Sequence, residues 1–262
     1  MNTPRKNLLW TKPVNAILGL SFLIPFAAAE AHIPFKAPVG LGVPGRRIAA
    51  GSRSMENKEH QCVANDARVV AMVPQSNMVL TTAKNPVLFF YVPQTSAPQL
   101  ELVVQDKENS QKFVKQFYKP SSQAGVVKIP ITATSLAAGK EYRWFFSIIC
   151  NPKERSKDQE VEGSIQRINP DSQLLTKLNS ATPNERVKFY AEAGYWADTT
   201  ASLAQLISDH PNEQNLKDDW KELLSAQGVD KLLSAQGVNL DKVATGVVNE
   251  PRVLEQEALR FN

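Results

Sequence analysis

The stretch LAAGKEYRWFFSIIC, residues 136–150, decides the fold class. In Tyr142–Cys150 both sets of alternating residues are largely apolar, a pattern that predicts a central strand buried on both faces. Leu136, Gly139 and Tyr142 have the spacing L-x-x-G-x-x-Y of a tyrosine corner, in which a Tyr near the start of a strand bonds back to upstream backbone. Gly139 permits the tight turn that this requires. The motif is typical of immunoglobulin-like and fibronectin-like sandwiches; an ordinary turn before a strand is the alternative.

On both sides of this stretch the chain consists of short β-rich runs separated by turn residues. The runs begin roughly every 9–16 residues, close to the spacing in a sandwich of antiparallel sheets. We therefore predict a mainly β fold, an immunoglobulin- or fibronectin-like antiparallel sandwich over residues 62–168. The predicted strands are Arg68–Val73, Met78–Thr82, Val87–Val92, Gln99–Gln105, Lys112–Tyr118, Val126–Ile131, Tyr142–Cys150 and Glu160–Ile168.

After Pro170 the hydrophobic period changes to 3.6, which predicts a small helical subdomain over residues 169–238. Thr182 and Glu185 form a capping box at the start of one of its helices. Tyr190–Pro211 resembles one tetratricopeptide-type hairpin, and since such a repeat needs about three copies to stand alone, we expect it to pack on the sandwich. The predicted helices are Asp171–Leu178, one from Thr182 to Gly194, Trp196–Asp209 and Leu216–Ala226.

The heptapeptide LLSAQGV occurs twice, at residues 223–229 and 232–238. A perfect tandem copy of this length indicates a local duplication and not a repeat architecture. The sequence offers no obvious position for the second copy in a compact core. We expect residues 239–262 to form a polar, frayed tail.

The first 31 residues have the features of a secretory signal peptide. A basic start is followed by an apolar run at residues 16–26 and by the small residues Ala27-Ala28-Ala29-Glu30-Ala31. We predict cleavage after Ala31, with cleavage after Ala29 as the alternative. The run is shorter than the ~20 residues of a membrane-spanning helix, so an uncleaved anchor is disfavoured. The expected product is periplasmic or extracellular, with no stable membrane insertion.

Export determines how the two cysteines are interpreted. In an oxidising compartment an even pair usually bonds, so we predict a structural disulfide between Cys62 and Cys150. A bridge closing a loop of this length contributes about 4–5 kcal/mol in the chain-entropy model. Because Cys62 precedes the first predicted strand, the bridge should tie the preceding segment to the core.

Residues 32–61 are rich in Pro, Gly and Arg and follow neither a helical nor a strand period, so we expect an extended arm. Its three basic residues, Arg46, Arg47 and Arg53, are candidates for binding a carboxylate or phosphate. The alternative is a solvated cluster.

Composition and motifs argue against several functional classes. The 262 residues carry 30 Lys+Arg against 26 Asp+Glu, and this formal charge of +4 does not indicate a nucleic-acid partner. The three histidines lack metal-ligand spacing, and no G-x-S-x-G, S-x-x-K or phosphate-loop motif occurs. We therefore expect no catalytic residue, metal or cofactor.

The remaining hypotheses concern binding. The favoured one is a non-enzymatic interaction module with a protein partner in the cell envelope. The alternative is a glycan-binding or weakly hydrolytic sandwich that uses aromatic residues near Trp144 and the acidic stretch Glu154–Glu162. Burial of Trp144 would remove that residue as a stacking platform.

Four stretches together resemble a known family. They are Gly42-Val-Pro-Gly-Arg-Arg with Ala50-Gly-Ser-Arg53, Phe90-Tyr-Val-Pro93, Tyr142-Arg-Trp-Phe with Cys150-Asn-Pro, and Val161-Glu-Gly-Ser-Ile-Gln-Arg167. With the helical segments around Tyr190–Trp196 and Trp220–Leu224, they resemble the cyanobacterial secreted proteins of domain-of-unknown-function family 928. The resemblance covers about Gly42 to Gly228. It implies a periplasmic or extracellular protein of a photosynthetic bacterium and implies no activity. The duplicated LLSAQGV departs from the family pattern.

Overall fold

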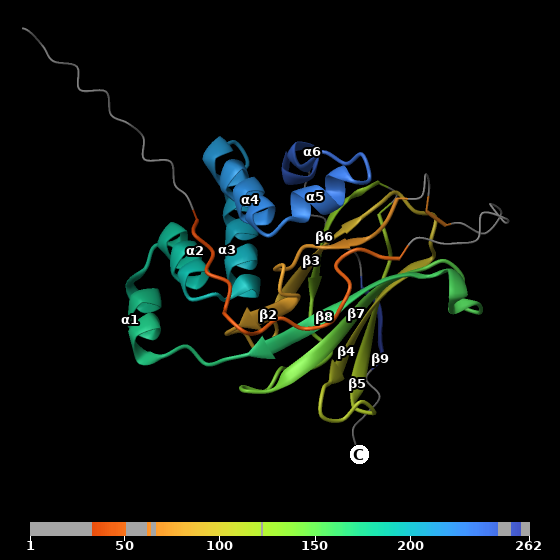
Figure 1. Cartoon of the computed structure of the whole chain (residues 1–262), viewed down its shortest axis with the longest axis horizontal. Coiled ribbons are helices and arrows are strands. Elements are labelled where there is room, and N and C mark those ends of the chain that lie inside the picture. Colours follow the sequence, from red (N-terminus) through yellow and green to blue (C-terminus); the bar gives the residue numbers. More distant parts are fainter. Residues whose placement is uncertain (1–32, 51–61, 64–66, 122, 246–252, 258–262) are drawn as a thin grey trace, which may run out of the picture. The chain divides into compact units, whose positions relative to one another are not determined.

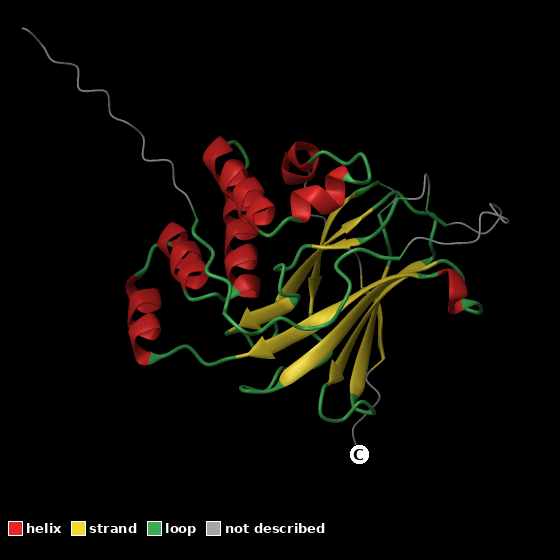
Figure 2. Ribbon diagram, viewed as in Figure 1, coloured by secondary structure: helices red, strands yellow, loops and turns green. Residues whose placement is uncertain are grey.

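The computed structural model describes residues 33–50, 62–63, 67–121, 123–245 and 253–257. The described residues all belong to one compact unit, Ala31–Asn262. The predicted signal peptide and Arg53 lie outside them. Within the described part, strands in two sheets are followed by several helices, which gives a mixed α/β fold (Figures 1 and 2). The strands β1–β8 fall on the eight runs predicted from the sequence.

The larger sheet has six strands. In sheet order these are β2 (Met78–Thr81), β8 (Gln159–Arg167), β7 (Glu141–Ile149), β4 (Gln99–Asp106), β5 (Phe113–Tyr118) and β9 (Val253–Glu257). β7 lies between β8 and β4, which confirms the central strand that its two-sided apolar pattern predicted. Its alternate residues Trp144, Phe146 and Ile148 are fully buried and form the inner face of the sheet.

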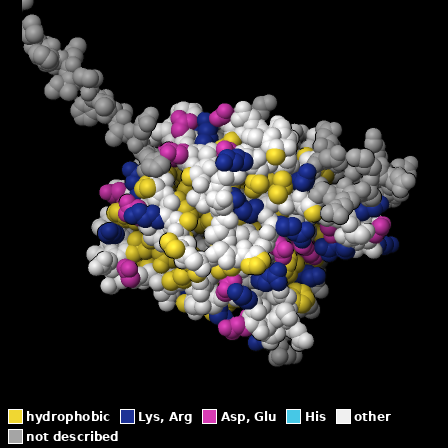
Figure 3. Space-filling view, in the orientation of Figure 1, with side chains coloured by type: hydrophobic (Ala, Val, Ile, Leu, Met, Phe, Trp, Pro, Cys, Tyr) yellow, Lys and Arg dark blue, Asp and Glu magenta, His cyan; other side chains and the backbone are white. Residues whose placement is uncertain are grey.

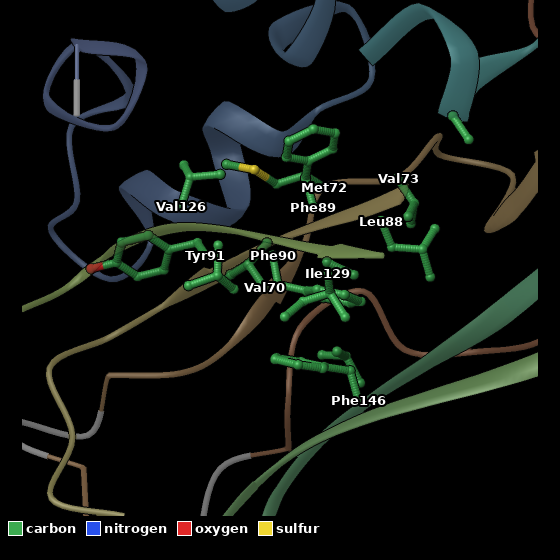
Figure 4. Packing of buried hydrophobic residues seen from close by; sticks show 14 of the residues in the cluster. Val70, Met72, Val73, Leu88, Phe89, Phe90, Tyr91, Val126, Ile129 and Phe146 are labelled. Carbon is green, nitrogen blue, oxygen red and sulfur yellow. The ribbon is translucent and has the colours of Figure 1, made fainter. Parts of the chain in front are cut away.

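The smaller sheet lies against this inner face. Its strands are, in order, β1 (Val70–Ala71), β3 (Val87–Val92) and β6 (Gly125–Pro130). Phe90 of β3 stacks on Phe146 at 4.0 Å between ring centroids, and Figure 4 shows the two residues facing each other across the core. Met72 and Phe89 point the other way, toward the helices (Figure 4). Burial on both faces explains why Val70, Met72 and Phe90 are fully inaccessible to solvent.

One pairing differs from the predicted antiparallel arrangement. β2 runs parallel to β8, with Met78 opposite Ser164 and Thr81 opposite Arg167. The period of 2 in the sequence reports which face of a strand is buried, and it is the same for both strand directions. The expectation of a purely antiparallel sheet was therefore wrong at this edge.

Helices cover the outer side of the smaller sheet and the β2 edge. They are α1 (Ser172–Ser180), α2 (Pro183–Glu192), α3 (Trp196–Asp209), α4 (Gln214–Ala226), α5 (Val229–Ser234) and α6 (Leu240–Thr245), with a short 3₁₀ helix at Arg155–Lys157. The capping box predicted for α2 is confirmed: the Thr182 hydroxyl accepts from the Glu185 N–H, and the Glu185 carboxylate accepts from the Thr182 N–H. The indole N–H of Trp196 donates to the Met72 carbonyl at 2.9 Å, and Trp220 meets Phe89 edge to face. These contacts join α3 and α4 to the sheet.

The part of the chain after Gly228 is more ordered than the sequence indicated. α5 contains the start of the second LLSAQGV copy, and its Leu233 is fully buried, so the expectation that this copy lacks a place in the core was wrong. α6 and β9 lie within the segment predicted as a frayed tail. The pairing of β9 with β5 is distant in sequence, and local composition does not report it.

Candidate functional site

The arm before Ala50 runs along the edge of both sheets. Isolated bridges pair Arg46 with Glu162 of β8 and Ile48 with Val70 of β1. Arg46 and Glu162 exchange two backbone hydrogen bonds, of 3.1 and 3.0 Å. Since successive side chains of an extended chain point in opposite directions, Arg46 and Arg47 diverge. The structure does not bring these two predicted binding residues together.

Arg46 lies on the outer face of the larger sheet, beside a polar recess. The cavity has a volume of about 260 Å³, and its described lining residues are Arg46, Ala50, Arg155, Asp158 and Glu160. The guanidinium of Arg46 is 3.7 Å from a carboxylate oxygen of Glu160 and 3.7 Å from one of Glu162. These are ion-pair distances, longer than those of charge-assisted hydrogen bonds.

The opposite wall of the recess is held in place by Arg155. Its guanidinium donates to the buried carboxylate of Glu101 at 2.9 Å and also to Asp158. Burial alone would lower the pKa of Arg155, but the hydrogen bonds to Glu101 and Asp158 outweigh it and raise that pKa. Asp158 also accepts the backbone N–H of Cys150 at 3.1 Å. The loop after β7 is thus fixed to both the sheet and the disulfide.

Glu160 is the carboxylate of the recess with a shifted proton affinity. Its side chain is half-buried on β8, and burial raises its pKa above the usual glutamate value. A hydrogen bond from the Ser147 hydroxyl at 3.3 Å and the charge of Arg46 act in the opposite direction. The recess therefore combines exposed cationic groups with a carboxylate that takes up a proton more readily than a free glutamate does.

The predicted disulfide is confirmed. Cys62 and Cys150 are bonded, with their Cα atoms 5.2 Å apart. The carbonyl of Cys62 accepts from the Thr95 hydroxyl at 2.7 Å and from the Ser96 N–H at 2.8 Å. The bridge therefore ties the end of the arm to the strand that leads into the recess loop.

The side chain of Arg47 lies on the other side of the arm, where its contact is structural. Its guanidinium donates to the backbone carbonyl of Gln227 at 2.7 Å. Burial lowers the pKa of Arg47 to about 10, so the group remains charged at neutral pH. It joins the arm to the end of α4 and does not contribute to the recess.

The residues of the proposed tyrosine corner also have structural contacts. The Tyr142 hydroxyl accepts the backbone N–H of Ala137 at 3.0 Å, five residues upstream. Gly139 has a φ of +79°, which favours glycine, and Leu136 is buried beneath the turn. These residues shape the approach to β7 and lie outside the recess.

A second partly buried carboxylate joins the helices to the sheet. Asp198, in the first turn of α3, accepts the Thr82 N–H at 3.0 Å and the Thr82 hydroxyl. Burial raises the pKa of Asp198, and the hydrogen bonds from Thr82 partly offset this effect. Its contacts serve to hold α3 against the end of β2.

The sequence suggested the acidic stretch Glu154–Glu162 only as part of the glycan-binding alternative, and it gave no prediction for Glu101. A charged residue at an alternate position of β4 was the available signal, but its partner Arg155 lies 54 residues away. Trp144 is fully buried, which removes it as a stacking platform. In the face shown in Figure 3, acidic and basic side chains are interspersed.

Neither a metal site nor a membrane-spanning helix is found among the described residues. Among residues 33–50, 62–63, 67–121, 123–245 and 253–257, no group of three or more His, Cys, Asp or Glu side chains is placed to hold a metal ion. None of the helices described is both long and apolar enough to span a bilayer.

Comparison with known proteins gives one match. A family model described as Domain of Unknown Function (DUF928) matches residues 48–236, more than two thirds of the 262 residues. The matched region contains β1–β8, α1–α5 and most of the recess, while Arg46 and Arg47 immediately precede it. No curated protein and no solved structure matches the chain.

Proposed function

The chain belongs to the DUF928 family, and from this premise we propose that it is an exported, non-enzymatic interaction protein of the cell envelope. The proposed contact surface is the recess at Arg46, Arg155 and Glu160. Its partner would be a protein that presents a carboxylate-bearing segment.

The geometry of Arg46 is the observation that carries this proposal. The guanidinium lies within ion-pair range of two carboxylates but beyond hydrogen-bond range of both, and 47% of the side chain is exposed. A partner carboxylate that approached at 2.7–2.9 Å would form shorter, charge-assisted bonds than those made within the chain. The opposite wall is rigid because Arg155 is held by Glu101 and Asp158.

Export is supported by the signal-peptide pattern of residues 1–31 and by the disulfide, since such bonds persist in oxidising compartments. The proposed location is periplasmic or extracellular, and the proposed source is a cyanobacterium, by resemblance to the family. No nucleic-acid partner is proposed.

We further propose that the two sheets are a variant of the immunoglobulin-like sandwich, carrying a tetratricopeptide-like hairpin in α2 and α3. The hydrogen bond from Ala137 to Tyr142 and the antiparallel ladder β8-β7-β4-β5 support the sandwich. The parallel pairing of β2 with β8 is the feature in which the two sheets differ from a purely antiparallel immunoglobulin-like sandwich. The packing of α2 against α3 supports the hairpin.

The test is a crosslinking pull-down from native envelope extract, read by mass spectrometry, with the wild type, Arg46→Glu and Arg143→Glu. Arg143 is the matched control, because it also pairs with Glu162 and has the same exposure, 46% against 47%, but does not line the recess. The proposal expects a partner that Arg46→Glu loses and Arg143→Glu retains. Equal recovery with both variants, or no partner above background, would count against it.

A second function, glycan binding, is favoured by the outer face of the larger sheet. Phe113 and Phe117 of β5 and Phe145 of β7 are only partly buried and alternate with core residues. The guanidinium of Arg143 lies 5.0 Å from the centre of the Phe145 ring. Exposed ring faces stack on sugars, so a panel of polysaccharides and peptidoglycan should bind the wild type and not Phe145→Ala. A panel without binding would exclude this alternative.

A further inference from the structure

The carboxylates around the recess are not held equally. Glu101 and Asp158 both accept hydrogen bonds from the guanidinium of Arg155. Glu162 accepts a hydrogen bond from the guanidinium of Arg143 at 2.9 Å. Charge-assisted hydrogen bonds of this kind stabilise the charged form of a carboxylate. These three acidic groups therefore belong to the fixed frame of the recess.

Glu160 is held more loosely than these three groups. The guanidinium of Arg46 lies 3.7 Å from its carboxylate, and the Ser147 hydroxyl donates to it at 3.3 Å. Burial, the largest effect, and the charge of Glu162 raise the pKa of Glu160. The hydrogen bond from Ser147 and the charges of Arg46 and Arg155 lower that pKa without reversing the shift. Glu160 is therefore the carboxylate of the recess whose charge is least well supported by its contacts.

A ligand carboxylate bound at Arg46 would add a negative charge beside Glu160. The guanidinium of Arg46 already lies within ion-pair distance of two carboxylates, those of Glu160 and Glu162. A third carboxylate on the same guanidinium would lie only a few ångströms from both of them. Like charges this close raise the pKa of the carboxylate that is less firmly held. Since Arg143 donates to Glu162 at 2.9 Å, the less firmly held carboxylate is that of Glu160.

We propose that the recess binds a ligand carboxylate together with one proton, which Glu160 takes up. This inference rests on the proposed function, because it uses the same contact at Arg46. Glu160 accepts the proton from solvent as the ligand binds and returns it to solvent when the ligand leaves. In its neutral form Glu160 neither competes for Arg46 nor repels the ligand, and its O–H can donate a hydrogen bond to the ligand carboxylate.

Proton uptake makes the affinity depend on pH in a defined direction. The charged groups that face Glu160 or share the recess with it come from the arm, from β8 and from the loop after β7: Arg46, Glu162, Arg155 and Asp158. Binding raises the pKa of Glu160 above its value in the free protein. The affinity should therefore increase as the pH falls from the higher of these two pKa values to the lower, and level off below the lower one. A rise of about one pKa unit, as expected beside a second carboxylate, corresponds to about a tenfold gain in affinity.

Isothermal titration calorimetry on the full chain tests the proposal, with an N-acetylated tetra-aspartate amide as the probe. Titrations at about pH 8 and about pH 5.5 compare the affinities while the aspartates of the probe, with an ordinary pKa of about 3.9, stay charged. Buffers with different ionisation enthalpies report the number of protons taken up. The expected result is a Kd about tenfold lower at the lower pH, with uptake of up to one proton per peptide between these values. Arg46→Glu should lose the binding, which would place the peptide in the recess.

Two matched variants identify the group that takes up the proton. Glu160→Gln and Glu162→Gln each remove one negative charge 3.7 Å from Arg46, on the same strand and the same face of the sheet. Glu160→Gln should bind the peptide at about pH 8 as tightly as the wild type does at about pH 5.5, without proton uptake. Glu162→Gln should keep both the pH dependence and the proton uptake.

The outcomes separate this inference from the proposed function. Binding that is lost in Arg46→Glu but shows no proton uptake in the wild type would overturn the inference and leave the carboxylate contact at Arg46 in place. Proton uptake that persists in Glu160→Gln would also overturn it, because another group would then carry the proton. Binding that Arg46→Glu does not weaken, or no binding at either pH, would overturn the inference and the proposed contact together.

Discussion

The two copies of LLSAQGV, residues 223–229 and 232–238, can be compared residue by residue. Each copy forms the end of a helix, α4 in the first case and α5 in the second. Gly228 and Gly237 both have a φ of +70°. Their N–H groups donate to the backbone carbonyls of Ser225 and Ser234, at 2.8 and 2.9 Å respectively. Both helices therefore end before the same left-handed glycine, although α4 ends at Ala226 and α5 ends one position earlier in its copy, at Ser234.

The glutamines also have equivalent contacts. The side-chain carbonyl of Gln227 accepts the N–H of Gln75 at 3.2 Å, and that of Gln236 accepts the N–H of Arg68. Gln75 and Arg68 lie on either side of β1, the edge strand of the smaller sheet. The duplication thus supplies two side-chain acceptors to the flanks of one edge strand, whose backbone groups need partners.

The copies differ in burial. Leu223, Leu224 and Val229 of the first copy are all fully buried, whereas in the second copy only Leu233 is, and Leu232 and Val238 are partly exposed. The first copy ends a helix of 13 residues that is anchored through Trp220 on Phe89, and the second ends one of six residues. Local sequence fixes the turn, and the preceding helix determines how deeply the copy is buried.

The largest expected contrast is between equivalent leucines. Leu223→Ala should lower the free energy of unfolding by about 3 kcal/mol, because it empties a fully buried site. Leu232→Ala should lower it by about 1 kcal/mol, because that side chain is partly exposed. Urea denaturation followed by circular dichroism measures both. Equal losses would show that the two copies contribute equally to the core.

The glutamines should give a smaller contrast. Gln227→Ala removes a buried side chain together with the acceptor of the Gln75 N–H and should lower stability by about 2 kcal/mol. Gln236→Ala removes a half-buried side chain together with the acceptor of the Arg68 N–H, so about 1 kcal/mol is expected. Thermal melting of the two variants under identical conditions compares them. A larger loss with Gln236→Ala would reverse the proposed order of the two acceptors.

Substitutions at the two equivalent glycines should lower stability equally, unlike those at the leucines and glutamines. A Cβ at Gly228 or Gly237 would meet no atom within 4 Å, so only the left-handed backbone resists substitution. Gly228→Ala and Gly237→Ala should each lower stability by about 1 kcal/mol. Melting temperatures that differ clearly between the two variants would mean that the helix ends are not equivalent.

Substitution of Arg47 should give the smallest loss of stability, and it should again distinguish the two copies. Arg47→Met removes the donor to the Gln227 carbonyl but also removes a buried charge, so the net loss should be under about 1 kcal/mol. Only the first copy has this contact, and backbone amide chemical shifts should therefore change around Gln227 and not around Gln236. Changes of similar size at both sites would indicate that the two copies are coupled.

Local patterns in the sequence predicted much of the fold. Alternating apolar residues located β1–β8, and the Thr182–Glu185 spacing located the start of α2. Two cysteines, together with the predicted export signal, predicted the disulfide. The strand and helix signals depend on residues that are close together in the chain. The disulfide could be predicted because two cysteines allow only one intramolecular pairing.

Long-range pairing explains what the sequence missed. The direction of β2 beside β8, and the pairing of β9 with β5, depend on segments far apart in the chain. Arg46 and Arg47 are neighbours in sequence, but the extended arm separates their side chains. Glu101 supports the wall of the recess only because the fold brings Arg155 to it. The position of the second LLSAQGV copy was missed for the same reason, since the donor to its Gln236 is the distant Arg68 N–H.

The central claim is that each copy of the heptapeptide protects one specific amide beside β1. Hydrogen exchange of the Gln75 and Arg68 amides, measured in the wild type, Gln227→Ala and Gln236→Ala, tests this most directly. We predict that Gln227→Ala accelerates exchange at Gln75 and leaves Arg68 unchanged, and that Gln236→Ala does the opposite. Unchanged exchange at both amides in both variants, or equal acceleration of both amides in either one, would contradict the account.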